Sequence, residues 1–205
     1  KTAYEMLRSL VGSEMCIRDK ISTMDVNPIF EQRRTVHEFK KERVNDDIID
    51  RALVAANLAP CHKLTFPWRY RDISVEKRKR IFEISLKLKS QKIKLSTSAE
   101  TKLYDKMMNP SHMIVASQIK SSNPVIEKED YAACSCSIQN MMLSLAHDNV
   151  GSKWSTGKVT KSPDTYEVTN INSDEEEIIG FIYVGYGKTP VEIKRPKIES
   201  IFSSI

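Results

Sequence analysis

The alternation of apolar and polar positions along the chain predicts helices separated by short, well-spaced strands. Between 46 and 58, apolar residues recur at helical spacing, Asn45 can cap the first turn, and Pro60 ends the helix. A capping box that begins at Thr97 starts another helix. The predicted helices cover 27–34, 46–58, 74–88, 98–108 and 127–148, and the predicted strands cover 66–73, 113–117 and 178–184. This order of elements indicates an α+β fold.

The expected helix over 127–148 is the longest, and its apolar residues are not confined to one stripe. An apolar pattern that goes nearly all round a helix is typical of a helix buried on every side. We therefore expect it to be a central helix or one at an interface between subunits.

The first residues of the chain carry a weaker pattern than the rest. Met24 opens the segment in which helical and strand signals become clear. We interpret residues 1–23 as a non-native or disordered N-terminal extension. Residues 24–205 are expected to form a single domain.

The composition, at 40% hydrophobic and 29% charged residues, is typical of a globular protein and argues against disordered or collagen-like classes. No apolar run reaches the ~18 residues that a membrane span needs. The cysteines have neither zinc-site spacing nor the density of a secreted scaffold, which favours a reducing, cytoplasmic location and no metal site. They are Cys16, Cys61, Cys134 and Cys136.

The positive charge is local. The stretch 76–106 holds ten Lys and Arg residues against four acids, a net of +6, whereas the whole chain carries +5. One hypothesis is therefore a basic module that binds nucleic acid or another anion. Few aromatic residues interleave with these cations, so a solvated helix face is the favoured interpretation.

Two segments in the N-terminal half of the chain carry side chains that could bind a ligand or take part in catalysis. Arg33, Arg34 and Thr35 leave the first helix together, and guanidinium forks match phosphate oxygens, although the helix dipole also favours basic residues there. The second segment, 59–68, is a proline-fixed loop that carries His62. It also carries a thiol at position 61, but no recognisable oxyanion loop accompanies it, so a nucleophilic cysteine is not favoured.

A third segment, 149–157, follows the longest helix and combines small residues with an aromatic one. Trp154 offers a flat apolar surface, and Ser155, Thr156 and Gly157 supply hydroxyl and N–H donors. These are the groups that a flat heteroaromatic ring needs. An ordinary helix–strand connection has the same pattern.

Taken in order, these segments and the last strand resemble the nitroreductase family of FMN-dependent NAD(P)H oxidoreductases, in its small single-domain branch, over about 27–202. The residues that carry the resemblance are Arg33-Arg34-Thr35, Ala59-Pro60 with His62 and Pro67-Trp68, Asp130-Tyr131-Ala132-Ala133, Gln139-Asn140, Gly151 with Trp154 and Gly157, and Gly180-Phe181-Ile182-Tyr183. The resemblance implies a central mixed or antiparallel sheet flanked by helices. It also implies a homodimer with FMN at the subunit interface and the long helix in the dimer core.

The resemblance further implies where FMN binds. Residues 33–35 would hold the phosphate and ribityl chain, and Arg195 is the candidate for a second phosphate contact. His62 would reach the flavin of the partner subunit, and residues 154–157 would meet the cofactor on their own side. The implied cofactor-binding residues are Arg33, Arg34, Thr35, His62, Trp154, Ser155, Thr156, Gly157 and Arg195.

The implied reaction passes a hydride from NAD(P)H through FMN to a nitroaromatic, quinone or similar small acceptor, with both substrates using one site in turn. No side chain is expected to be catalytic, because the flavin supplies the reactivity. The chain departs from relatives at Val36, His37, Leu58 and Ser155, which suggests weak cofactor affinity. A flavin-binding homologue without turnover therefore stays an alternative.

Overall fold

The computed structural model describes residues 28–91, 94–188 and 193–204. Residues 1–23, which we interpret as an N-terminal extension, lie outside the described residues. The chain divides into two units, 1–32 and 33–205. In the first unit the structure describes α2 (Pro28–Gln32) alone. The predicted helix over 27–34 is therefore too long by two residues at its end, and the arginines that follow belong to the second unit.

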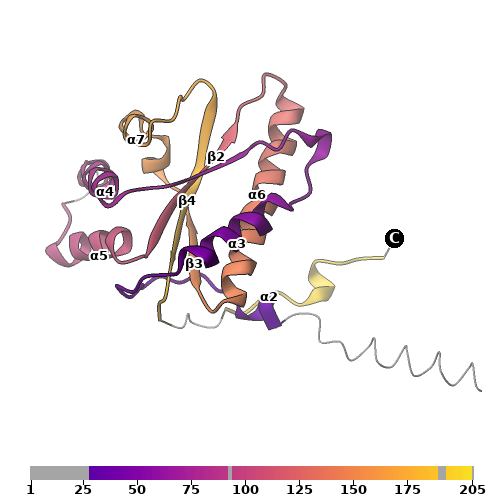
Figure 1. The fold of residues 1–205 in the computed structure, drawn as a ribbon, viewed down its shortest axis with the longest axis horizontal. Helices are drawn as coiled ribbons and strands as arrows, with labels where there is room; N and C mark the ends of the chain where they lie inside the picture. Colours follow the sequence, from indigo (N-terminus) through magenta and orange to yellow (C-terminus); the bar gives the residue numbers. More distant parts are fainter. Residues whose placement is uncertain (1–27, 92–93, 189–192, 205) are drawn as a thin grey trace, which may run out of the picture. The chain divides into compact units, whose positions relative to one another are not determined.

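The second unit is built on a four-stranded sheet in which all neighbours are antiparallel, in the order β1-β2-β4-β3 (Figure 1). The strands are β1 (Trp68–Asp72), β2 (His112–Ile119), β3 (Gly151–Ser155) and β4 (Glu176–Gly185). The predicted α+β class is confirmed, and of the two expected sheet types, mixed or antiparallel, the structure has the antiparallel one.

Strand β3 was not predicted, because its residues were interpreted as a loop. It lies at the edge of the sheet and has the sequence Gly-Ser-Lys-Trp-Ser, which lacks the β-branched residues typical of strands. Its hydrogen bonds to the ten-residue strand β4 hold it in place. Tertiary pairing overrides the weak local preference.

Helices cover both faces of the sheet (Figure 1). On one face lie α3 (Asp46–Asn57) and α6 (Pro124–His147), and on the other lie α4 (Val75–Ser90), α5 (Thr97–Met108) and α7 (Pro163–Thr169). Three short 3₁₀ turns complete the described elements: η1 (His62–Leu64), η2 (Lys158–Lys161) and η3 (Ile198–Ser200).

Capping residues set where the helices begin. Asn45, the predicted cap, accepts a hydrogen bond from a first-turn N–H group of α3, and Ser74 does the same for α4. Helix α5 is capped by Ser96, one residue before the predicted cap. Helix α6 starts at Pro124 after Asn123, which accepts from two first-turn N–H groups, so the predicted start at 127 was late.

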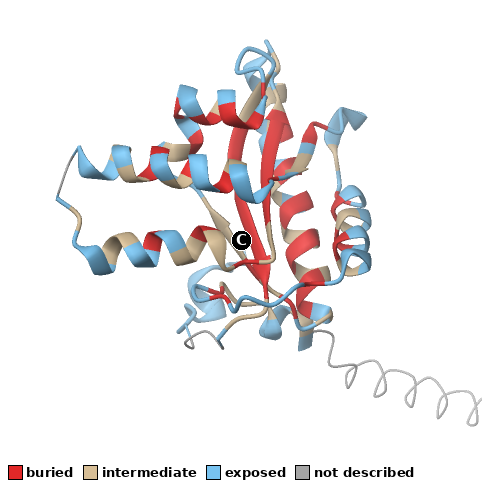
Figure 2. Cartoon of the chain, turned by 60° about the vertical axis from the view of Figure 1, so that its left-hand side comes forward, coloured by how far each residue is buried: buried red, intermediate tan, exposed pale blue. Residues whose placement is uncertain are grey.

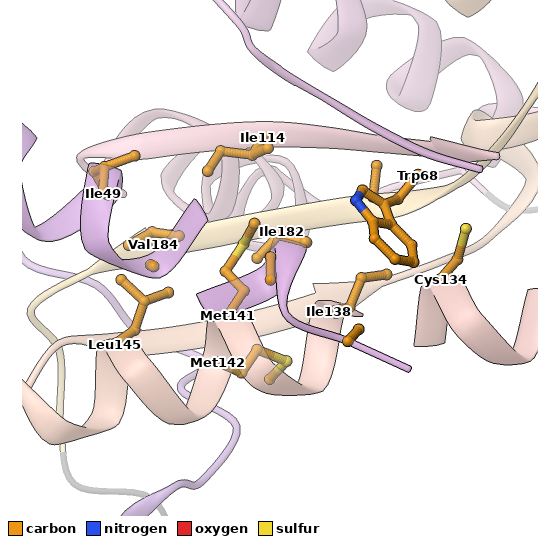
Figure 3. Close-up of a cluster of buried hydrophobic side chains, with 14 of the residues drawn as sticks. Ile49, Trp68, Ile114, Cys134, Ile138, Met141, Met142, Leu145, Ile182 and Val184 are labelled. Carbon is orange, nitrogen blue, oxygen red and sulfur yellow. The ribbon is translucent and has the colours of Figure 1, made fainter. Parts of the chain in front are cut away.

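The sheet divides the core into two apolar clusters. Figure 2 shows that buried residues fill the central strands and recur along the helices around them. The cluster under α3 and α6 includes Ile114 and Ile182 from the sheet and Met141 and Leu145 from α6 (Figure 3). Each such side chain contributes about 1.5–3 kcal/mol when it is fully buried. The opposite cluster holds Phe181 and other side chains beneath α4, α5 and α7.

Within one protomer, α6 is buried on the side that faces the sheet and α3, but Tyr131, Ala132 and Cys136 are exposed. The prediction of burial on every side is therefore not met inside a single chain. Apolar residues remain exposed on the outer side of α6. The hypothesis that this helix lies at an interface between subunits therefore stands.

Candidate functional site

The segment that follows α2 in sequence is held against the free edge of the sheet. Thr35 forms a parallel bridge with Ser152 of β3, and the Val36 N–H donates to the Ser152 carbonyl at 3.1 Å. Phe39 forms an antiparallel bridge with Gly187, just beyond β4. These bonds fix the backbone that carries Arg33, Arg34 and Thr35.

Val36 is buried in this contact between two glycines. A Cβ atom at Gly151 would lie 2.5 Å from Val36 Cγ2, and one at Gly187 would overlap Val36 Cγ1. The glycines therefore leave the space that the valine occupies. The departure from relatives at position 36 thus has a structural role in anchoring the segment.

Arg33 lies within electrostatic reach of two other guanidinium groups. Burial lowers the pKa of Arg33, and the positive charges of Arg195 and Arg34 lower that pKa further. Arg34 also donates from Nη1 to the Arg33 carbonyl at 3.0 Å. Like charges gathered in this way are stabilised by a bound anion, and arginine binds phosphate oxygens in bidentate fashion. The structure thus brings the predicted residue Arg195 near the 33–35 segment.

Lys106 of α5 is a half-buried cation that faces strands β3 and β4. Its ammonium group donates to Ser155 Oγ at 3.0 Å and lies 5.1 Å from the centre of the Tyr183 ring. Burial lowers the pKa of Lys106 to about 8, and the charges of Lys153 and Lys89 act in the same direction. Among the described residues, no carboxylate forms an ion pair with it.

Two cavities meet at Lys106. The first, of about 560 Å³, lies between α4, α5, η2 and the sheet, and Thr156 and Gly157 line it. The second, of about 470 Å³, is lined by residues 37–39 and by Lys102, Asp105 and Lys106 of α5. Lys153 joins the strand to this segment, because its ammonium donates to His37 Nδ1 at 2.9 Å. Lys106 is thus placed to contact a ligand in either cavity.

Sequence reasoning missed Lys106 because it was grouped with the surface cations of the stretch 76–106. The structure separates the members of that stretch. Arg78 is buried and donates to the carbonyls of Ile73, Pro110 and Ser111, so it stabilises the fold. A lysine among the apolar residues of a capped helix was the available signal.

The predicted loop 154–157 is not one binding surface. Trp154 packs against the α6 side of the sheet, where its Nε1 donates to the Ile179 carbonyl at 3.2 Å and its ring covers Gly180. Ser155 points to the opposite side, toward Lys106. The sequence predicts that Trp154 offers a flat surface to the cofactor. In the structure, the Trp154 ring packs against the sheet and contributes to the fold.

His62 lies on η1, is exposed, and lines neither of the two cavities. The loop around it is unusual, since Lys63, Leu64 and Phe66 all have positive φ angles, of 61°, 55° and 44°. Thr65 holds the loop to α6 by donating to the buried Asp130 Oδ1 at 2.5 Å. The structure therefore presents His62 at the surface of the chain.

The model of the nitroreductase family matches residues 30–186. The chain belongs to the nitroreductase family. The resemblance seen in the sequence is thereby confirmed, and so is the prediction of an oxidoreductase of this family. The match spans the whole sheet, both cavities and the arginine segment.

Individual relatives agree with this assignment. The "Putative NAD(P)H nitroreductase YfhC" of Bacillus subtilis is 28% identical over 82% of this chain and 87% of its own length. A nitroreductase-like family protein from Bacillus cereus is 25% identical with a TM-score of 0.73, over 86% of this chain and 94% of its own. A mutant of the FMN- and NADPH-dependent nitroreductase NfnB, from Sphigopyxis sp. strain HMH, shares the fold at 12% identity, with a TM-score of 0.72 over 86% and 96% of the two chains.

In the part of this nitroreductase-family chain that the structure describes, no helix is long and apolar enough to cross a membrane. Within the same residues, no group of three or more His, Cys, Asp or Glu side chains could hold a metal ion. The three cysteines that the structure describes, Cys61, Cys134 and Cys136, are free thiols.

Proposed function

We propose that the protein is an FMN-dependent oxidoreductase that passes a hydride from NAD(P)H to a nitroaromatic, quinone or similar small acceptor. The family assignment supports the reaction class. The observation that carries the cofactor assignment is the placement of Arg33 near Arg195, together with a half-buried Lys106 that has no acidic partner among the described residues. These cations fit a ligand with a dianionic end and an electron-accepting ring.

The arginines would hold the phosphate. The positive charges of Arg33 and Arg195 repel each other. A phosphate between them would offset this repulsion and would accept charge-assisted hydrogen bonds from both guanidinium groups. Thr35, fixed by its bridge to Ser152, would offer a hydroxyl to the ribityl chain. The backbone bridges keep these groups in place before the ligand arrives.

Lys106, Thr156 and Gly157 would contact the ring. When bound, FMN would supply the hydride-transfer chemistry, so the chain needs no catalytic acid, base or nucleophile of its own. Lys106 would place positive charge beside the ring, where low surrounding polarity strengthens its effect. Ser155 keeps the ammonium group oriented.

NAD(P)H and the acceptor would use the same face of the ring in turn, in a ping-pong sequence. This order follows from the single ring site and is part of the proposal. A flavin-binding protein that lacks turnover is the alternative, and acceptor-dependent oxidation of NAD(P)H separates the two.

The proposed assembly is a homodimer. Exposed apolar side chains gather on α3, on η1 and on α6, and they include Val54, Leu58, Leu64 and Tyr131. Leu58 is 77% exposed and Leu64 is 71% exposed. Exposed apolar side chains that gather in a patch are typical of an interaction surface. A second copy on this face would bury them and would bring its own His62 loop toward the site.

Purification followed by visible absorption spectroscopy tests the proposal directly. We expect one FMN to bind per chain. Under anaerobic conditions, NAD(P)H should be oxidised beyond one equivalent per FMN only when a quinone or nitroaromatic acceptor is present. FMN binding without acceptor-dependent oxidation would support the homologue without turnover. Absence of FMN binding would overturn the cofactor assignment.

A further inference from the structure

The larger cavity has a predominantly apolar interior. Leu88 of α4, Leu103 and Met107 of α5, and Phe181 of β4 contribute side chains to its wall. Its volume of about 560 Å³ lies in the range of small-molecule sites. A flat ring system of two or three fused rings fits such a space.

The polar part of the cavity has one sign of charge. Three ammonium groups line it, from Lys89 of α4, Lys106 of α5 and Lys158 of η2. None of the described residues that line it is Asp or Glu. Lys89 and Lys158 are exposed, so their charges lie toward the rim, whereas Lys106 is half-buried.

The neighbouring cavity differs in this respect. Glu38 and Asp105 line it alongside Lys102 and Lys106, so acids accompany its cations. The excess positive charge is therefore a property of the larger cavity. Lys89 acts on the interior, because its charge contributes to the lowered pKa of Lys106.

We propose that this cavity selects acceptors that combine a flat apolar ring with one acidic group. The ring would lie against Leu103 and Phe181, and the carboxylate or similar anion would pair with Lys89 and Lys158 at the rim. This inference rests on the proposed function for its reaction and names the substrate class of that same site. Lys106 stays available to the cofactor ring.

The binding test uses two ligands of nearly equal shape, 1-naphthoate and the neutral 1-naphthamide, and needs no electron transfer. Isothermal titration calorimetry on the full chain should show naphthoate binding at least tenfold more tightly than the amide. In the double variant Lys89→Gln with Lys158→Gln, the two affinities should become equal. Lys79→Gln, an exposed lysine of α4 outside the cavity, is the matched control and should keep the preference.

Equal affinities in the unmodified protein, or a preference that survives the double variant, would overturn the inference. So would failure of both ligands to bind. Circular dichroism of the double variant shows that its fold is intact.

A kinetic test compares 4-nitrobenzoate with 4-nitrobenzyl alcohol as acceptors. We expect a higher kcat/KM for 4-nitrobenzoate, because its KM should be lower. The double variant should raise the KM for 4-nitrobenzoate. Turnover of both acceptors with equal efficiency would overturn the inference while leaving the proposed function standing. No turnover of either acceptor would overturn the proposed function, while the naphthoate preference would still report on the cavity.

Discussion

The Lys106 ammonium group donates a 3.0 Å hydrogen bond to the Ser155 hydroxyl, and this bond joins helix α5 to the edge strand β3. The lysine is thereby held over the Tyr183 ring at the meeting point of two cavities. A side chain from the basic stretch and a side chain from the predicted cofactor segment thus belong to one site.

The first prediction concerns pH. Because burial lowers the pKa of Lys106 to about 8, its positive charge is lost as pH rises through 8. Binding of FMN, whose ring carbonyl oxygens would accept a hydrogen bond from the charged ammonium group, should therefore weaken between pH 7 and pH 9. FMN titrations by fluorescence quenching at several pH values measure this, and Lys106→Met should abolish the dependence while lowering affinity at pH 7 about tenfold, or about 1.4 kcal/mol. A pH dependence that persists in the variant would rule out Lys106 as its source.

The second prediction concerns the arginines. Arg33→Gln and Arg195→Gln should each weaken FMN binding at least tenfold, because each removes a phosphate contact. Riboflavin lacks the phosphate, so its weaker binding should change little in either variant. Arg43→Gln is the control, since Arg43 only forms an exposed pair with Asp46. Equal losses for FMN and riboflavin would contradict the phosphate assignment.

The third prediction concerns the packing of Trp154. A Cβ atom at Gly180 would overlap the Trp154 indole, so Gly180→Ala should lower the free energy of unfolding by about 1–3 kcal/mol. Replacing Trp154 with the smaller phenylalanine in the same chain should recover part of that loss. Urea denaturation of the single and double variants measures both changes. Additive losses would show that the two residues do not share this space.

The fourth prediction concerns His112 and Asp72, whose Nδ1 and Oδ2 atoms lie 2.7 Å apart. The hydrogen bond to Asp72 raises the pKa of His112 in the folded protein, so this contact stabilises the fold fully below the unfolded pKa of about 6.5. That contribution is lost as pH rises through the raised folded value. Urea denaturation from pH 5 to pH 9 should show the decline, and Asp72→Asn should flatten it. An unchanged profile in the variant would assign the decline to another group.

The fifth prediction concerns assembly. Leu58→Asp places a charge on the exposed apolar face and should convert the proposed dimer into a monomer with weaker FMN binding. Size-exclusion chromatography with light scattering measures the mass. Val75→Asp adds the same charge at an exposed valine in the first turn of α4 and should leave the mass unchanged. A monomeric unmodified protein would contradict the homodimer.

Local signals in the sequence were sufficient for much of the fold. Asn45 caps its helix as expected, because capping depends on a few neighbouring residues. Strand β3 was missed because its five residues form a strand only when β4 lies alongside. The cap of α5 was misplaced by one residue, since Ser96 and Thr97 are both good caps.

The sequence by itself determined the α+β class, the nitroreductase resemblance and the arginine segment, because these depend on local pattern and on the order of motifs. Only the tertiary structure decided that Arg195 lies near Arg33 and that Lys106 belongs to the site and not to the basic surface. It also decided that the Trp154 ring packs against the sheet. These relationships join residues far apart in the chain, and their distances are set by how the helices and strands pack.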